Sequence, residues 1–273
     1  MPWRSPRIVT QCPVRLHVEV QGQGPVVLLA HGFGGSARNW RPQVRALRDR
    51  HRVVVYDARG HARSESPPAA SDYSPDTLTA DLGRVLAEHG GDRPAVVGGL
   101  SMGAGIALRF ALREPERVRG LVLMAPPPAG QPARRGRGGW SADFAEAIER
   151  EGLDAAGERY AWGERSGLDR ASGQLVRQGF LEHSPQALVH ILRGVLDAWP
   201  SWTEQAPALR RLRCPTLLVV GERDARSSAM ARKLARTLPE ARLEVVPGAG
   251  HVVNLAAREQ VSLSMASFLA ELG

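Results

Sequence analysis

The chain has 273 residues, 43% of them hydrophobic, and a formal net charge of +8. This hydrophobic content supports a sizeable core and excludes a disordered or fibrous protein. No apolar run approaches the roughly 18 residues that span a bilayer, and residues 1–11 lack the apolar segment of a secretory signal. We therefore expect a cytoplasmic location and no membrane partner.

The positive charge raises the question of a nucleic-acid partner. Thirty-five of the 36 basic residues are arginine, which indicates a coding bias rather than a binding surface. They are scattered along the chain, and the one dense cluster is Arg134, Arg135 and Arg137. We therefore expect no nucleic-acid partner. The alternative, a nucleic-acid-binding protein, depends on the net charge alone.

The two cysteines, Cys12 and Cys214, lie far apart in the sequence, and we expect both to be reduced thiols. The chain has no CxxC motif and no His/Cys cluster with zinc spacing. The sequence therefore predicts no metal site.

In chain order, the first predicted element is a half-buried strand, indicated by alternating apolar and polar residues from Val14 to Gln21. Six later apolar runs are unbroken, as is typical of strands covered on both faces in a parallel sheet. They are Val26–Ala30, Val53–Tyr56, Ala95–Gly98, Gly120–Ala125, Thr216–Val220 and Leu243–Val246.

Apolar residues at helical spacing occur between and after these runs. The predicted helices are Pro42–Arg50, Asp76–His89, Ala104–Arg113, Ala229–Leu238 and Ser262–Leu272. In the last of them, Leu263, Ala266, Leu269 and Ala270 are expected on one apolar face. Strands alternating with helices predict an α/β fold with a mostly parallel, doubly wound sheet.

One long segment, from Pro126 to about Ala208, contains no strand-like run and holds four of the six tryptophans. We predict a core domain of residues 1–125 and 209–273, with residues 126–208 inserted as a helical cap. Trp140, Trp162 and Trp199 of this segment are candidates for lining an apolar substrate pocket. Ordinary packing within the cap is the alternative for each of them.

The run Gly99-Leu100-Ser101-Met102-Gly103 has the form G-x-S-x-G, between an apolar strand and a helix rich in small residues. A sharp turn there would strain Ser101 and present its hydroxyl at the edge of the sheet. Such a turn needs small residues two places before and after the serine, as this run has. Ser101 is therefore the predicted nucleophile, and a glycine-rich helix start is the alternative.

A serine nucleophile needs a base, and the base needs a group that orients it. Asp224 and His251 each follow a predicted strand, at the edge of an open α/β sheet where active sites form. The chain order Ser, Asp, His is that of α/β-hydrolases. We predict that His251 is the base and that Asp224 orients it.

Alternatives to these two roles stay open at the level of sequence. Asp224 could pair with Arg223 or Arg226, Glu222 could be the acid, and His251 could be an ordinary loop histidine.

The run His31-Gly32-Phe33-Gly34-Gly35 follows a strand and opens a glycine-rich loop. Acyl transfer creates a negative oxygen that needs preorganised donors, each contributing on the order of 3 kcal/mol. We assign the backbone N–H groups of Phe33 and Met102 to this oxyanion hole. His31 is expected to brace the loop rather than act as a base, and it is also a pocket candidate, with Gly32 and Val252.

Together these residues resemble the α/β-hydrolase family, especially small bacterial esterases, enol-lactonases, non-haem haloperoxidases and C–C bond hydrolases. The shared motifs are the H-G-F-G-G loop, D-A-R-G-H from Asp57, the L-S-M-G turn, G-E-R-D and the final G-A-G-H. The resemblance implies an acyl-enzyme formed on Ser101 and no metal or organic cofactor.

It further implies a serine hydrolase that cleaves a carboxylic ester or lactone of a small, partly apolar substrate. Alternatives are a C–C bond hydrolase, a thioesterase, a perhydrolase or a slow ligand-binding member. The sequence indicates neither the substrate nor the oligomeric state.

The chain departs from the family pattern in two places. Ala62 stands where relatives often have glycine, and the turn reads M-G-A-G rather than the frequent M-G-G. If the backbone at Ala62 has a positive φ angle, an alanine there is strained.

Overall fold

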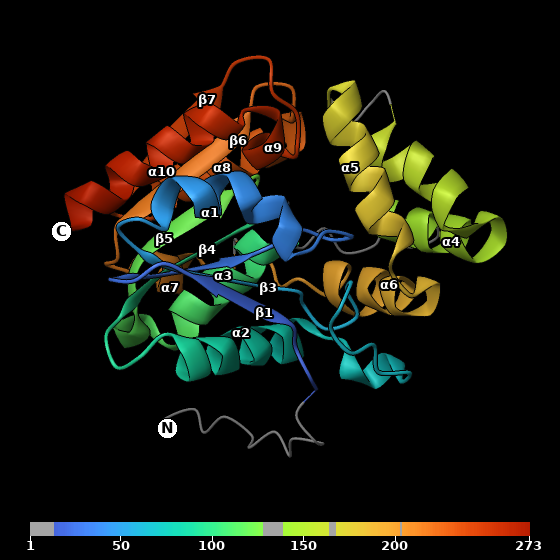
Figure 1. Cartoon of the computed structure of the whole chain (residues 1–273), viewed down its shortest axis with the longest axis horizontal. Coiled ribbons are helices and arrows are strands. Elements are labelled where there is room, and N and C mark those ends of the chain that lie inside the picture. Colours follow the sequence, from blue (N-terminus) through green and yellow to red (C-terminus); the bar gives the residue numbers. More distant parts are fainter. Residues whose placement is uncertain (1–13, 128–138, 164–167, 203) are drawn as a thin grey trace.

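The computed structural model describes residues 14–127, 139–163, 168–202 and 204–273. Within them, a seven-stranded sheet has the order β1-β3-β2-β4-β5-β6-β7 (Figure 1). β1 is antiparallel to β3, and all other pairs are parallel. The strands are β1 Val18–Gln21, β2 Val26–Ala30, β3 Arg52–Tyr56, β4 Ala95–Leu100, β5 Val118–Met124, β6 Thr216–Gly221 and β7 Ala241–Val246.

Each of the six unbroken apolar runs lies on a strand, so the predicted α/β fold is confirmed. The first strand is shorter than predicted, because β1 begins only at Val18. The backbone before it pairs with a loop instead: Arg15 N–H donates to the Glu65 carboxylate, and His17 N–H donates to Ser64 Oγ. These bonds replace the ladder that a longer strand would need.

Helices cover both faces of the sheet. On one face, α1 (Arg41–Leu47) packs on α10 (Arg258–Leu272), with α9 (Val253–Ala256) beside them. On the other face lie α2 (Pro75–His89), α3 (Met102–Arg113) and α8 (Ala225–Thr237). This is the doubly wound arrangement that the alternating pattern predicts.

The predicted apolar face of the last helix is confirmed at Leu269, which is 4% exposed, and is wrong at Leu263. Leu263 is 72% exposed, whereas Val261, Met265 and Phe268 are buried. The helix begins at Arg258, four residues earlier than expected. Its packing against α1 therefore falls on the stripe containing Val261 and Met265 rather than on Leu263.

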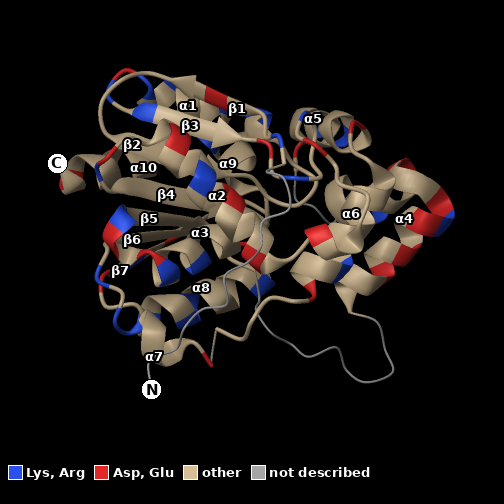
Figure 2. Ribbon diagram, turned by 90° about the horizontal axis from the view of Figure 1, so that it is seen from below, with Lys and Arg blue, Asp and Glu red and all other residues tan. Residues whose placement is uncertain are grey.

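Between β5 and β6 the described chain forms helices and no strand. They are α4 (Trp140–Gly157), the π-helical turn η4 (Glu158–Trp162), α5 (Arg170–Leu181), α6 (Pro185–Ile191), the π-helical turn η6 (Leu192–Leu196) and the short α7 (Ala206–Leu209) before β6. Figures 1 and 2 show α4, α5 and α6 grouped beside the sheet. We call residues 139–163 and 168–196 of this group the cap. The boundaries at 125/126 and 208/209 stay a prediction, and α7 crosses the second one.

Arginines of the cap pair with its acidic residues: Arg193 binds Glu149, Arg177 binds Asp154 and Arg159 binds Glu151. In Figure 2, Lys and Arg are interspersed with Asp and Glu. The arginine cluster at residues 134–137 and Cys12 lie outside the described residues. No helix in the described ranges is long and apolar enough to cross a bilayer.

Candidate active site

Ser101 occupies the turn between β4 and α3, with φ 53° and ψ −113°. A non-glycine residue in such a conformation costs on the order of 1–3 kcal/mol and is found mainly at functional sites. Two backbone bonds hold the turn: Ser101 N–H donates to Met124 O at 2.9 Å, and Gly105 N–H donates to Ser101 O at 3.0 Å. The strained turn that the G-x-S-x-G motif predicts is therefore present.

The glycines that flank Ser101 let its two neighbouring elements approach closely. A Cβ at Gly103 would lie 2.1 Å from Ala30 O, and a Cβ at Gly99 would lie 2.4 Å from the carbonyl carbon of Gly103. Both contacts are with backbone, which cannot rotate away as a side chain can. Any side chain at either position would push α3 away from the sheet.

Asp224 and His251 meet where β6 and β7 end. His251 Nδ1–H donates to Asp224 Oδ2 at 2.6 Å. Burial alone would raise the pKa of Asp224, but the hydrogen bond and charge of His251, with two bonds from Ser227, lower it to about 2. The carboxylate is therefore ionised at neutral pH and able to orient the imidazole.

The alternatives for the acid are not seen in the described part of the chain. Asp224 forms its ion pair with His251, and no ion pair of Arg223 or Arg226 with it occurs there. Glu222 is exposed and accepts the N–H of Gly248 at 2.8 Å.

The loop after β2 lies beside Ser101, since a Cβ at Gly32 would be 3.5 Å from Ser101 Cβ. The Gly32 carbonyl accepts two bonds, from Gly35 N–H at 3.0 Å and from His31 Nδ1 at 2.7 Å. The Phe33 amide donates to no acceptor among residues that the structure describes. Met102 begins α3, where helix amides lack an intrahelical acceptor.

His31 is fully buried, and its Nε2 accepts the N–H of Ala58 at 2.9 Å. Burial lowers the pKa of His31 to about 4, against the opposing effect of the Asp57 carboxylate, so the ring is neutral at pH 7. With both ring nitrogens engaged by backbone, His31 braces the loop.

The sequence reasoning missed a second brace. His61 Nε2 accepts the N–H of Gly34 at 3.2 Å, and its Nδ1 donates to Arg59 O. Asp57, at the end of β3, accepts the N–H of Ala37 at 2.7 Å. The conspicuous D-A-R-G-H motif was the available signal, although it does not say which loop these side chains hold.

Ala62 has φ 43°, so the strain anticipated at this position is real.

The predicted pocket tryptophans have different surroundings. Trp199 is 4% exposed, and its ring edge would lie 2.9 Å from a Cβ at Gly105, one turn beyond Ser101. Trp140 is 41% exposed and packs edge-on against Phe144. Trp162 lies inside the cap, where its indole N–H donates to Glu158 and its ring packs edge-on against Phe180, and its role in a pocket stays a prediction. Val252 is half-buried beside His251.

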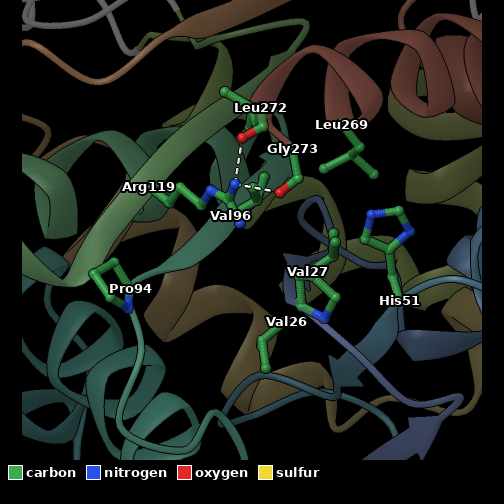
Figure 3. A pocket seen from close by; sticks show the side chains of 10 residues that line it. Val26, Val27, His51, Pro94, Val96, Arg119, Leu269, Leu272 and Gly273 are labelled. Carbon is green, nitrogen blue, oxygen red and sulfur yellow. Dashed lines mark hydrogen bonds between the residues drawn. The ribbon is translucent and has the colours of Figure 1, made fainter.

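A small hollow lies at the opposite end of the sheet, among the first residues of β2, Val26 and Val27, and the side chain of Arg119 (Figure 3). Arg119 donates there to the backbone oxygens of Leu272 and Gly273. Because Ser101, Asp224 and His251 all follow the carboxyl ends of strands, this hollow is not the candidate site. Among the described residues, no group of three or more His, Cys, Asp or Glu could hold a metal ion.

Residues 25–257 match the sequence model for the alpha/beta hydrolase fold. The chain is 28% identical over 279 residues to a 2-(acetamidomethylene)succinate hydrolase of Mesorhizobium japonicum, covering 94% of this chain and 92% of that protein. Among solved structures, it is similar to a thermophilic esterase from Thermogutta terrifontis, with a TM-score of 0.82 and 29% identity over 96% of each chain.

An enol-lactonase from Burkholderia xenovorans LB400 is also similar, with a TM-score of 0.81 and 25% identity, covering 94% of this chain and 97% of that one. By name, these three similar proteins are a hydrolase, an esterase and an enol-lactonase. With the sheet order and the strained serine turn, these similarities lead to one conclusion: the chain belongs to the α/β-hydrolase family.

Proposed function

We propose that this chain is a serine hydrolase that cleaves a carboxylic ester or lactone of a small, partly apolar substrate. The observation that carries the proposal is the strained Ser101 turn at the same sheet edge as a 2.6 Å hydrogen bond between His251 and Asp224. An activated serine requires this combination of an exposed hydroxyl, a base and an orienting carboxylate.

In the proposed mechanism, Ser101 Oγ attacks the acyl carbon while His251 takes its proton. The bond to the leaving alkoxide breaks as His251 returns that proton, and an acyl-enzyme remains. Water then attacks the acyl carbon while His251 takes its proton. The bond to Ser101 Oγ breaks as His251 returns that proton to the serine, and the acid is released. The Phe33 and Met102 amides stabilise the oxyanion in both steps.

Aromatic rings near the loop after β2 support the proposal that the substrate is partly apolar. Phe33 packs edge-on against Phe144 and Phe180 of the cap, with ring centroids 5.7 Å and 6.1 Å apart. Trp199 closes against the helix that follows Ser101, and its indole N–H is buried without a partner among the described residues. Such a donor fits a substrate that carries an oxygen beside its apolar part.

A panel of p-nitrophenyl esters with short and medium acyl chains, together with simple lactones, tests the proposal. We expect turnover of at least one ester or lactone by the wild type and none above background by Ser101→Ala. A thioester and a perhydrolysis assay in the same panel address the neighbouring reactions. Equal rates for both proteins on every substrate would refute the proposal.

A further inference from the structure

Residues at the end of α5 and just after it contact the loop that carries the Phe33 amide, the proposed oxyanion donor. A Cβ at Gly34 would lie 2.4 Å from the ring of Phe180, so this ring covers Gly34 closely. Beside it, Glu182 forms an ion pair with Arg38 of η1 (Ala37–Trp40), in which Arg38 Nη1 donates to Oε1 at 2.8 Å and to Oε2 at 2.6 Å. The cap therefore contacts the core at the loop itself and just after it.

His183 makes the third contact. This side chain is 5% exposed, with Nε2 3.0 Å from Gly35 O and Nδ1 3.0 Å from Phe180 O. Burial lowers the pKa of His183 against the opposing effect of these carbonyls, so the ring is neutral at pH 7 and has one N–H. Phe180 O already accepts the backbone N–H of His183, whereas Gly35 O has no other donor among the described residues. The proton therefore belongs on Nε2, where it donates to Gly35.

A chain of bonds leads from this contact to the Phe33 amide. Gly35 N–H donates to Gly32 O, and the Gly32 carbonyl shares one planar peptide unit with the N–H of Phe33. In a trans peptide these two groups point in opposite directions, so a fixed Gly32 carbonyl fixes the direction of the Phe33 N–H. A fixed position of Gly35 therefore fixes the direction in which the Phe33 N–H points.

We propose that His183 is a positioning residue for the oxyanion hole, through which the seated cap holds the Phe33 amide in its catalytic direction. This inference extends the proposed function and depends on it. The position of the cap then affects the catalytic geometry, because an unseated cap would leave the oxyanion donor misdirected. A misaligned donor weakens binding of the transition state more than binding of the substrate.

Paired amide substitutions test the bond. In His183→Gln the side-chain amide reaches the place of Nε2 and can still donate to Gly35 O, whereas in His183→Asn it reaches only the place of Nδ1. We expect His183→Asn to lower kcat 10- to 100-fold with KM changed less than about threefold, below the roughly 100- to 1,000-fold loss for deleting a donor. We expect His183→Gln to stay within about threefold of wild type in kcat.

His190→Asn is the matched control, because His190 also joins the cap to a core carbonyl, Pro68 O at 3.2 Å, away from the oxyanion loop. It should change kcat less than twofold. If thermal denaturation shows that His183→Asn does not fold, His183→Leu, whose side chain has no hydrogen-bond donor and suits a buried position, takes its place.

The inference is overturned if His183→Asn (or His183→Leu in its place) retains the kcat of His190→Asn, or if it raises KM alone. Activity of the wild type and its loss in Ser101→Ala are measured first. If the wild type has no activity, the proposed function is rejected. If the wild type is active and His183→Asn (or His183→Leu in its place) is equally active, only the role of His183 is rejected.

Discussion

Gly103 is the position at which one added methyl group should damage the site most. Its Cβ would lie 2.1 Å from Ala30 O and 2.7 Å from His31 O, and ordinary contact begins at 3.4 Å. Relieving the closer contact requires α3 and β2 to separate by about 1.3 Å. Since a misplacement of about 1 Å can lower a rate 100-fold, we expect Gly103→Ala to lower kcat/KM for a p-nitrophenyl ester roughly 100-fold. Overpacking should also lower the free energy of unfolding by about 1–3 kcal/mol.

Gly179→Ala supplies the matched control, because Gly179 lies within α5 and a Cβ there meets no atom within 4 Å. Replacing a helix-interior glycine in open space should stabilise the protein by up to about 1 kcal/mol and leave kcat/KM unchanged. Steady-state kinetics and urea unfolding of both variants provide the comparison. Wild-type activity in Gly103→Ala would refute the claim that close packing of α3 on β2 places Ser101.

Three further predictions concern the acid, a strained turn and the pocket. Asp224→Asn should lower kcat on the order of 10⁴-fold, the loss known for a Ser-His-Asp triad, because an amide favours the wrong imidazole tautomer; a loss below tenfold would exclude the assigned role. Because the pKa of Asp224 is lowered to about 2 in the fold, its ionised form contributes stability that is present above its ordinary value near 3.8 and lost as pH falls through about 2. Acid unfolding of Asp224→Asn should accordingly show a weaker pH dependence in that range than the wild type. Ala62→Gly should raise the free energy of unfolding by about 0.5–1 kcal/mol, since φ 43° strains alanine but not glycine; a lower melting temperature would contradict this. Trp199→Phe removes the unpartnered indole N–H but keeps an aromatic ring, so KM should rise for oxygen-bearing acyl groups and not for plain alkyl ones; equal effects on both series would argue against an indole contact with substrate.

Local patterns predicted most of the fold. Unbroken apolar runs located six strands, because strands buried on both faces must be apolar throughout. The first strand and the buried face of α10 were less well predicted. The bonds of Arg15 and His17 to a distant loop, and the packing of Val261 and Met265 on α1, are tertiary interactions that periodicity alone does not encode.

At the candidate site, motif and chain order located the strained serine turn and the hydrogen-bonded Asp224–His251 pair. The supports of the oxyanion loop were harder to predict. His61 and His183 belong to segments far from His31 in sequence, yet both bond to consecutive glycines of one loop. The D-A-R-G-H motif marks His61 without indicating which loop it holds, and nothing local to His183 indicates a bond to a backbone group so remote along the chain.

The central claim is that Ser101 is an activated nucleophile. The most direct measurement is labelling with a fluorophosphonate, followed by peptide mass spectrometry to locate the adduct. We predict one stoichiometric adduct on Ser101 in the wild type and none in Ser101→Ala. Absence of labelling in the folded wild type, or an adduct on another residue, would contradict the account.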